Sequence, residues 1–497
     1  MISVGPVGPA RRAVILMNQD EAGIRQHGTH RDLEGRGELE GKPRADAPGL
    51  DAIIVPGARP AEYLDHAVTL ARAAQCSLVV LCSQNLRGKD VKEYLVARSF
   101  SDAIVIDLPP GYSHRLFHFP GLLRMKDQLP AACRNRATDL SMKRNIGLVL
   151  ARMMGWQRVF FLDDDIRDIS YQDLQHTVNM LGSFSAAGMR VTEFPDNSIV
   201  CHANRMTGGS QDVFVSAAAL AVNCDSDIGF FPDIYNEDWL FFFDAVSEGH
   251  VGNSNLKATQ LYYYPFANAA RAAWQEFGDV LAEGLYALLH VGLDVGQATS
   301  RYWAFFLEAR RNFLEETLSR AQNAPPDMRD EIVASVQAAE KCLHKIDPDL
   351  CARYVQAWRR DLRSWKLRWA EIPRMPSLDA ALAVLGLATT SDDITRRILH
   401  PQDRPTPRRT LGPFTIPKFE TLREMAEHIS TRRLGAPLPV EKKRKKPLTE
   451  PGRHRRQSRM TSADQRSRVI TLAHVSVIYC QAVAMRIVSL GRMSAYP

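Results

Sequence analysis

The sequence has no CxxC pair, although eight cysteines are scattered over its 497 residues. No spacing among its Cys and His residues is typical of a zinc site, so the cysteines favour a reduced, cytoplasmic protein. The apolar run near the N-terminus, AVILM, has five residues and is too short for the core of a signal peptide. The sequence also has no internal repeat. These absences argue against a secreted disulfide-rich domain, a zinc-binding module and a repeat protein.

Charge imbalance is small outside one segment. The formal net charge is +7, but residues 442–468 hold eleven Lys or Arg against two acidic residues, a net +9, which leaves −2 on the rest of the chain. Aromatic residues are absent from this basic segment, so it offers no surface on which bases could stack, and nucleic acid is not an expected partner. The basic segment is expected to be a solvated linker. The alternative is that the protein is not an enzyme and binds an anionic surface through this segment.

Long apolar runs are missing as well. The longest candidate, residues 469–485, has 17 residues, includes His474 and Gln481, and is marginal for a membrane span. We expect a cytoplasmic protein, with a peripheral membrane contact through the basic and apolar tail as one option. The predicted organisation is a disordered extension (1–50), an α/β domain (51–292), a helical region (293–432), a basic linker (433–468) and an apolar tail (469–497).

The α/β prediction rests on short apolar runs that alternate with helical patterns. Buried strands are predicted at 52–55, 77–83, 102–109 and 158–162, and helices at 61–74 and 139–156. This alternation is typical of a Rossmann-like domain with a mainly parallel sheet, which binds ligands beyond the carboxyl ends of its strands. Polar or loop residues that would meet at those ends are Pro56, Ser83, Asp107 and Asp163.

The stretch RVFFLDDDIRDIS ends an apolar run with three carboxylates, Asp163, Asp164 and Asp165. Two carboxylates at i and i+2 can share one Mg²⁺ or Mn²⁺, whose remaining positions accept water or the phosphates of a substrate. A diphosphate is the natural ligand, because the metal neutralises its charge and stabilises it as a leaving group. The structural alternative is a helix cap or a solvated acidic turn.

Two further groups of residues support a site. Lys143, Arg144 and Asn145 begin the helix before this strand and could face a diphosphate or a base. Downstream, Glu237 and Asp238 lie among aromatic residues, where desolvation would raise the pKa of a carboxyl group and suit a general base. The alternative is that Asn236 caps a helix whose first turn contains the two acids.

The order of these motifs, from AIIVPGARP through MKRNIGLVLA and VFFLDDD to FFPDIYNEDWLFF, resembles the nucleotide-diphospho-sugar glycosyltransferases of the GT-A fold, particularly the family-2-like ones. The resemblance covers about residues 51–290. It implies a nucleotide-sugar donor, a small-molecule or glycan acceptor, and Mn²⁺ or Mg²⁺ as cofactor. It further implies the following roles: Asp163 and Asp164 beside the nucleotide, Asp163 and Asp165 on the metal, Asp238 as base with Glu237 next in line, Pro56, Ala58 and Arg59 in the nucleotide pocket, and Gly208 and Gly209 in an acceptor-side loop before a strand DVFVS.

The resemblance leaves alternatives open. The QxxRW motif of processive synthases is absent, as are their membrane helices, and the stereochemistry of transfer is undecided. The triplet also resembles that of sugar-nucleotide mutases of the reversibly glycosylated polypeptide type. Asp164, Asp165 and Asp168 form a DDxxD pattern, which prenyl-diphosphate synthases carry on a helix. A HAD-type phosphatase and a nucleotidyltransferase fit less well, because DxDx[TV] and a GxGxR loop are missing.

Two finer expectations follow from the sequence. Residues 274–289 read as an amphipathic helix that closes the acceptor side of the site. Asp164 would point to the opposite side of an extended chain from Asp163 and Asp165 and would tolerate substitution best.

Overall fold

The first four strands form one half of the sheet and are parallel, as the sequence predicts. The protein is described by a computed structural model for residues 24–35, 49–134, 138–192, 198–212 and 214–389. Strands β1 (Ala52–Val55), β2 (Ser77–Cys82), β3 (Ala103–Asp107) and β4 (Arg158–Leu162) pair in parallel in the order β3-β2-β1-β4. Their apolar side chains are buried on both faces, which explains why they are near-continuous hydrophobic runs rather than alternating ones.

The second half of the sheet mixes directions. Beyond β4 the order continues through β7 (Ala219–Asn223), β6 (Ala186–Thr192), β8 (Val251–Gln260) and β5 (Ile166–Arg167). Strand β7 is antiparallel to both β4 and β6, and β5 is antiparallel to β8, whereas β6 and β8 are parallel. The chain is thus an α/β protein with a mixed eight-stranded sheet.

The predicted strand DVFVS is wrong. The described residues of that stretch, 212 and 214–216, are irregular, and the strand starts only at Ala219. The physical reason lies next to the stretch, where the backbone amide of Ala217 donates to the carboxylate of Asp238 instead of to a neighbouring strand.

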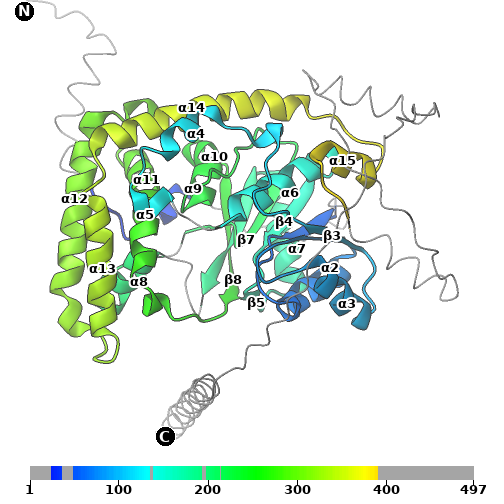
Figure 1. The fold of residues 1–497 in the computed structure, drawn as a ribbon, viewed down its shortest axis with the longest axis horizontal. Coiled ribbons are helices and arrows are strands. Elements are labelled where there is room, and N and C mark those ends of the chain that lie inside the picture. Colours follow the sequence, from blue (N-terminus) through cyan, green and yellow to red (C-terminus); the bar gives the residue numbers. More distant parts are fainter. Residues whose placement is uncertain (1–23, 36–48, 135–137, 193–197, 213, 390–497) are drawn as a thin grey trace, which may run out of the picture. The chain divides into compact units, whose positions relative to one another are not determined.

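Helices cover both faces of the sheet (Figure 1). One face packs on α2 (Asp65–Ala74), α3 (Gly88–Ala97) and α7 (Tyr171–Asn179), and the other on α6 (Leu140–Met154). Helix α6 ends where predicted, at Gly155, whose φ of 74° is a left-handed conformation that glycine adopts readily. The shorter helices are α4 (Pro120–Lys126), α5 (Ala131–Arg134), α8 (Ile199–Met206), α9 (Glu237–Phe241), α10 (Phe243–Ser247) and α15 (Leu378–Leu385).

The predicted helical region is present and shares its core with the sheet. Within the described residues it comprises α12 (Ser300–Ser319), α13 (Arg329–Leu343) and α14 (Pro348–Glu371). It packs on α11 (Ala270–His290), which lies inside the predicted α/β domain. Trp303, Trp358 and Trp365 of this region are fully buried in the hydrophobic core that includes α6. The described residues form one compact unit, so the boundary at residue 292 does not separate independent cores.

Helix α11 is not the amphipathic helix that the sequence suggested. Fourteen consecutive residues, Gln275–Leu288, are buried. Neighbouring helices α5, α8, α9, α12 and α13 pack around it, so its polar residues are enclosed rather than solvated.

The prediction of disorder over residues 1–50 is wrong for residues 24–35. This segment forms a 3-10 turn, Arg31–Leu33, and Gly35 donates its amide to Val251 of β8 at 2.7 Å. Within it His30 is buried and lies 3.0 Å from Glu283 of α11. Specific polar contacts therefore order a stretch that has little apolar surface of its own.

The predicted basic linker and apolar tail lie outside the described residues. Within the described ranges, no helix has the length and apolar character that crossing a membrane requires.

Candidate active site

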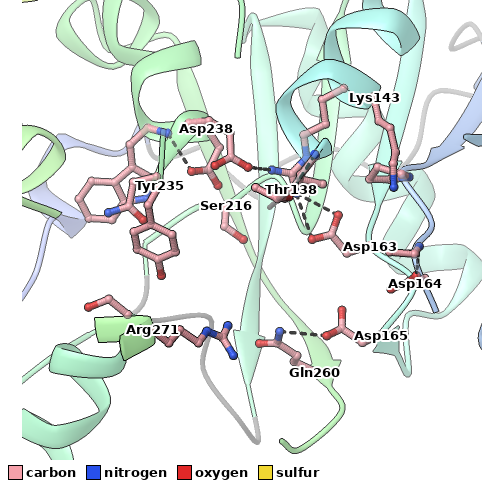
Figure 2. Close-up of a pocket in the computed structure, with 18 of the residues that line it drawn as sticks. Thr138, Lys143, Asp163, Asp164, Asp165, Ser216, Tyr235, Asp238, Gln260 and Arg271 are labelled. Carbon is pink, nitrogen blue, oxygen red and sulfur yellow. Dashed lines mark hydrogen bonds and ion pairs between the residues drawn. The ribbon is translucent and has the colours of Figure 1, made fainter. Parts of the chain in front are cut away.

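A cavity of about 560 Å³ lies beyond the carboxyl ends of β1 and β4, and α11 lines its other side (Figure 2). Its wall is strongly acidic, with eight carboxylates against four Lys or Arg side chains. The carboxylates are Asp139, Asp163, Asp164, Asp165, Glu237, Asp238, Asp279 and Glu283, and the cations are Arg59, Lys143, Arg144 and Arg271. This is where an open α/β sheet is expected to bind a ligand.

Each carboxylate of the Asp triplet has its own partners. Asp163 accepts two hydrogen bonds from Arg144, at 2.9 and 3.0 Å. Asp165 accepts one from Arg59 at 2.7 Å and one from the Gln260 side chain at 3.3 Å. Burial raises the pKa of both carboxyl groups, to about 6 for Asp163, against the lowering effect of the arginine beside each. A cation bound beside these two carboxyl groups would favour their ionised form.

Asp164 organises the loop after β1. Its carboxylate is buried and accepts the backbone amides of Ala58 and Arg59, at 2.8 and 2.9 Å, and the Arg59 guanidinium. These bonds argue against the expectation that Asp164 tolerates substitution best. The extended-chain alternation that suggested it stops at Leu162, and beyond that point hydrogen bonds decide where the side chain points.

We expect Asp164→Ala to lower the free energy of unfolding by about 1–3 kcal/mol, because two amides and a guanidinium lose a charged acceptor. Urea denaturation measures this change. Asp168→Asn is the matched control, since Asp168 is exposed and keeps a left-handed φ of 62° that asparagine tolerates. Equal stability of the two variants would contradict the role given to Asp164.

Arg144 joins the two acidic motifs. It is 3% exposed and donates from Nη2 to Asp163 and from Nη1 to Glu237 at 2.7 Å, although these acids are 74 residues apart in the chain. Through Arg144, helix α6 thus bonds to the residue that follows β4 and to the first residue of α9, and both residues line the same cavity. Lys143, its neighbour, donates to the Gly57 carbonyl at 2.7 Å and lies 3.1 Å from Asp139, so it supports the loop after β1.

Asp238 is the second residue of α9 and lines the cavity. Its Oδ2 accepts the Ala217 amide at 2.8 Å and its Oδ1 the Trp239 amide at 2.9 Å. Burial and the adjacent Glu237 charge raise the pKa of Asp238 to about 6, while Arg144 and the two amides act in the opposite direction. A carboxyl group with this pKa is largely ionised at neutral pH and can still accept a proton, as a general base must.

Several predicted residues stand apart from the cavity. Asp107 accepts the Gly88 amide at 2.6 Å and so caps α3, and Asn145 is bonded through its side chain to both the amide and the carbonyl of Phe231. Gly208 and Gly209 end helix α8, where Gly209 donates to the Asn204 carbonyl. None of these residues, nor Ser83, lines the cavity, whereas Pro56, Ala58 and Arg59 do.

The wall that faces the triplet includes α11, the helix expected at residues 274–289 on the acceptor side, but none of its lining residues was predicted. Gln260 ends β8, and Arg271, Trp274, Asp279 and Glu283 come from α11. Among the lining cations of the described chain, Arg271 is the one for which no ion pair is found. Its guanidinium lies 4.7 Å from the centre of the Tyr263 ring and faces the triplet across the cavity (Figure 2). The sequence feature that could have indicated this wall is the pair Asp279 and Glu283, two acids four residues apart on α11.

Asp163 and Asp165 are the candidate ligands for a divalent cation in this cavity. Within the described residues no group of three or more His, Cys, Asp or Glu side chains forms a complete metal site. Asp163 and Asp165 nevertheless line one cavity and offer hard oxygen ligands, although each is also bonded to an arginine. Mg²⁺ usually takes only one or two protein carboxylates and fills its other positions with water and substrate phosphates, so this pair fits such an ion.

The DDxxD alternative does not fit this geometry. Asp164 and Asp165 follow a strand, Asp168 is exposed beyond the two-residue strand β5, and the fold is α/β rather than all-helical.

No protein-family model matches the chain, and no curated protein matches it significantly.

Proposed function

We propose that the protein is a metal-dependent glycosyltransferase of the GT-A type, which moves a sugar from a nucleotide diphosphate to a hydroxyl or amine acceptor. The observation that supports this proposal is the Arg144 bridge between Asp163 and Glu237. The metal-binding candidate Asp165 and the base candidate Asp238 are close in sequence to these two acids and line the same cavity.

The donor half of the cavity is the edge formed by β1, β4 and α6. Asp163 and Asp165 would hold Mn²⁺ or Mg²⁺, which stabilises the negative charge of the departing diphosphate. Pro56, Ala58 and Arg59 border the space for the nucleotide, and Asp164 fixes that loop. Arg271, which faces this edge from the opposite wall, would meet the terminal phosphate as charge develops there.

The acceptor half is formed by α9 and α11. Asp238 would take the proton from the acceptor hydroxyl or amine as that oxygen or nitrogen bonds to the anomeric carbon. The bond between the anomeric carbon and the phosphate oxygen breaks with its electron pair, and the nucleoside diphosphate leaves. Aromatic rings of Phe214, Tyr235, Trp239 and Trp274 line this half and limit the access of water.

A panel of sugar nucleotides tests the proposal by thermal shift. We expect at least one of them to raise the melting temperature in the presence of Mn²⁺ and to do so much less with EDTA. A ligand at 100 times its Kd adds about 2.7 kcal/mol to the free energy of unfolding. Absence of stabilisation by UDP-, GDP- and dTDP-sugars alike would contradict the proposed function.

A further inference from the structure

Helix α9, which carries Glu237 and Asp238, begins in an unusual conformation. Asn236 precedes it with φ 58° and ψ 39°, which is left-handed, and its side chain does not cap the helix. Instead its Nδ2 donates to Oδ1 of Asp279 on α11 at 3.0 Å. Left-handed backbone disfavours most side chains, and asparagine is among the few that adopt it. The direction in which Asp238 enters the cavity therefore depends on how Asn236 is held.

Helix α11 contacts this turn at three successive places. Besides the Asn236 bond, Gly278 packs against the Tyr235 carbonyl so closely that a Cβ at position 278 would lie 2.2 Å from that oxygen. About two helical turns further on, the Tyr286 hydroxyl donates to the Trp239 carbonyl at 3.2 Å. Helix α11 thus holds residues 235–239 at two positions before the two acids and at one position after them.

Asp279 is itself held from the helical region. Arg310 of α12 donates to Oδ2 of Asp279 at 3.0 Å and makes a two-pronged pair with Glu276, at 2.9 and 2.8 Å. Arg310 and Glu276 are completely buried, and Asp279 nearly so. Burial raises the pKa of Asp279, and the Arg310 charge favours the ionised form that accepts the Asn236 amide.

We propose that Asn236, Asp279 and Arg310 are positioning residues. Through their hydrogen bonds, helix α12 of the helical region fixes the position of the base Asp238. This inference rests on the proposed function, because it takes Asp238 as the proton acceptor. A base acts only within hydrogen-bond reach of the proton that it removes, and a displacement of about 1 Å can cost about 100-fold in rate. The helices beyond residue 292 are then part of the catalytic apparatus rather than an appended domain.

Asn236→Gly tests the first link. Glycine adopts the same left-handed backbone without strain, so the variant removes the bond to Asp279 and little else. We expect kcat to fall at least about tenfold while the Kd for the donor with Mn²⁺ stays unchanged. Asn255→Gly is the matched control, since Asn255 is also left-handed, with φ 55°, but exposed on β8 and outside the cavity wall.

Hydrogen exchange of residues 236–242 gives a readout that does not depend on activity. We expect faster exchange of this segment in Asn236→Gly, and also in Arg310→Lys, which keeps the charge but loses the two-pronged geometry. Unchanged exchange in both variants, or a kcat of Asn236→Gly within twofold of the wild type, would overturn the inference. If the wild type transfers no sugar, the proposed function fails, and the exchange data alone decide whether the turn is held as inferred.

Discussion

Asp238→Asn should stop transfer while leaving the donor bound. The amide keeps the size of the side chain but cannot accept the acceptor proton, and loss of a general base typically costs 10²–10⁴-fold in rate. We therefore expect kcat to fall by about that factor and the Mn²⁺-dependent thermal shift with the donor to persist. Single-turnover kinetics at saturating donor measure the effect.

The pH profile of the wild type provides the companion result. A base works in its ionised form, so the rate should fall as the pH drops through about 6 and Asp238 takes up a proton. At saturating Mn²⁺, which would hold Asp163 ionised, the acid limb of the profile should be missing from the residual activity of Asp238→Asn. Glu248→Gln, an exposed acid at the end of α10, is the control and should keep both the rate and the limb. Full activity of Asp238→Asn would show that another group is the base.

Asp165→Asn should abolish the metal dependence. Asn retains the shape of the side chain but removes a charged oxygen ligand, and we expect the affinity for Mn²⁺ in the presence of a sugar nucleotide to fall by at least about 100-fold. Calorimetric titration of Mn²⁺ measures the loss. Asp168→Asn, which lies three residues further along and is exposed, should bind the metal as the wild type does. Equal Mn²⁺ affinity of the two variants would place the metal elsewhere.

The parts of the fold that the sequence predicted are those that local patterns determine. Strands β1 to β4 are apolar runs closed by polar or loop residues, and helix α6 has both a helical period and a glycine at its end. Because parallel strands bring their carboxyl ends to one edge, the location of the Asp triplet in a cavity wall could be predicted from these runs alone.

The parts that the sequence did not predict depend on partners distant in the chain. Nothing near Asp164 indicates that it would accept amides from Ala58 and Arg59, 105 or more residues away. In the sequence, the polar residues of α11 resemble the solvent-exposed face of a helix. In the structure, α12 and α13 pack around this helix and bury them. Residues 24–35 have the composition of a disordered segment and are ordered through contacts such as that of His30 with Glu283.

The single guanidinium of Arg144 also has a consequence for how substitutions combine. Asp163 and Glu237 share it, so removing either acid leaves Arg144 fully available to the other. The energetic effects of the two removals are then not independent, and the cost of the second depends on whether the first has been made. In the proposed reaction, this shared side chain would couple donor binding at the Asp triplet thermodynamically to the acidic pair at the start of α9.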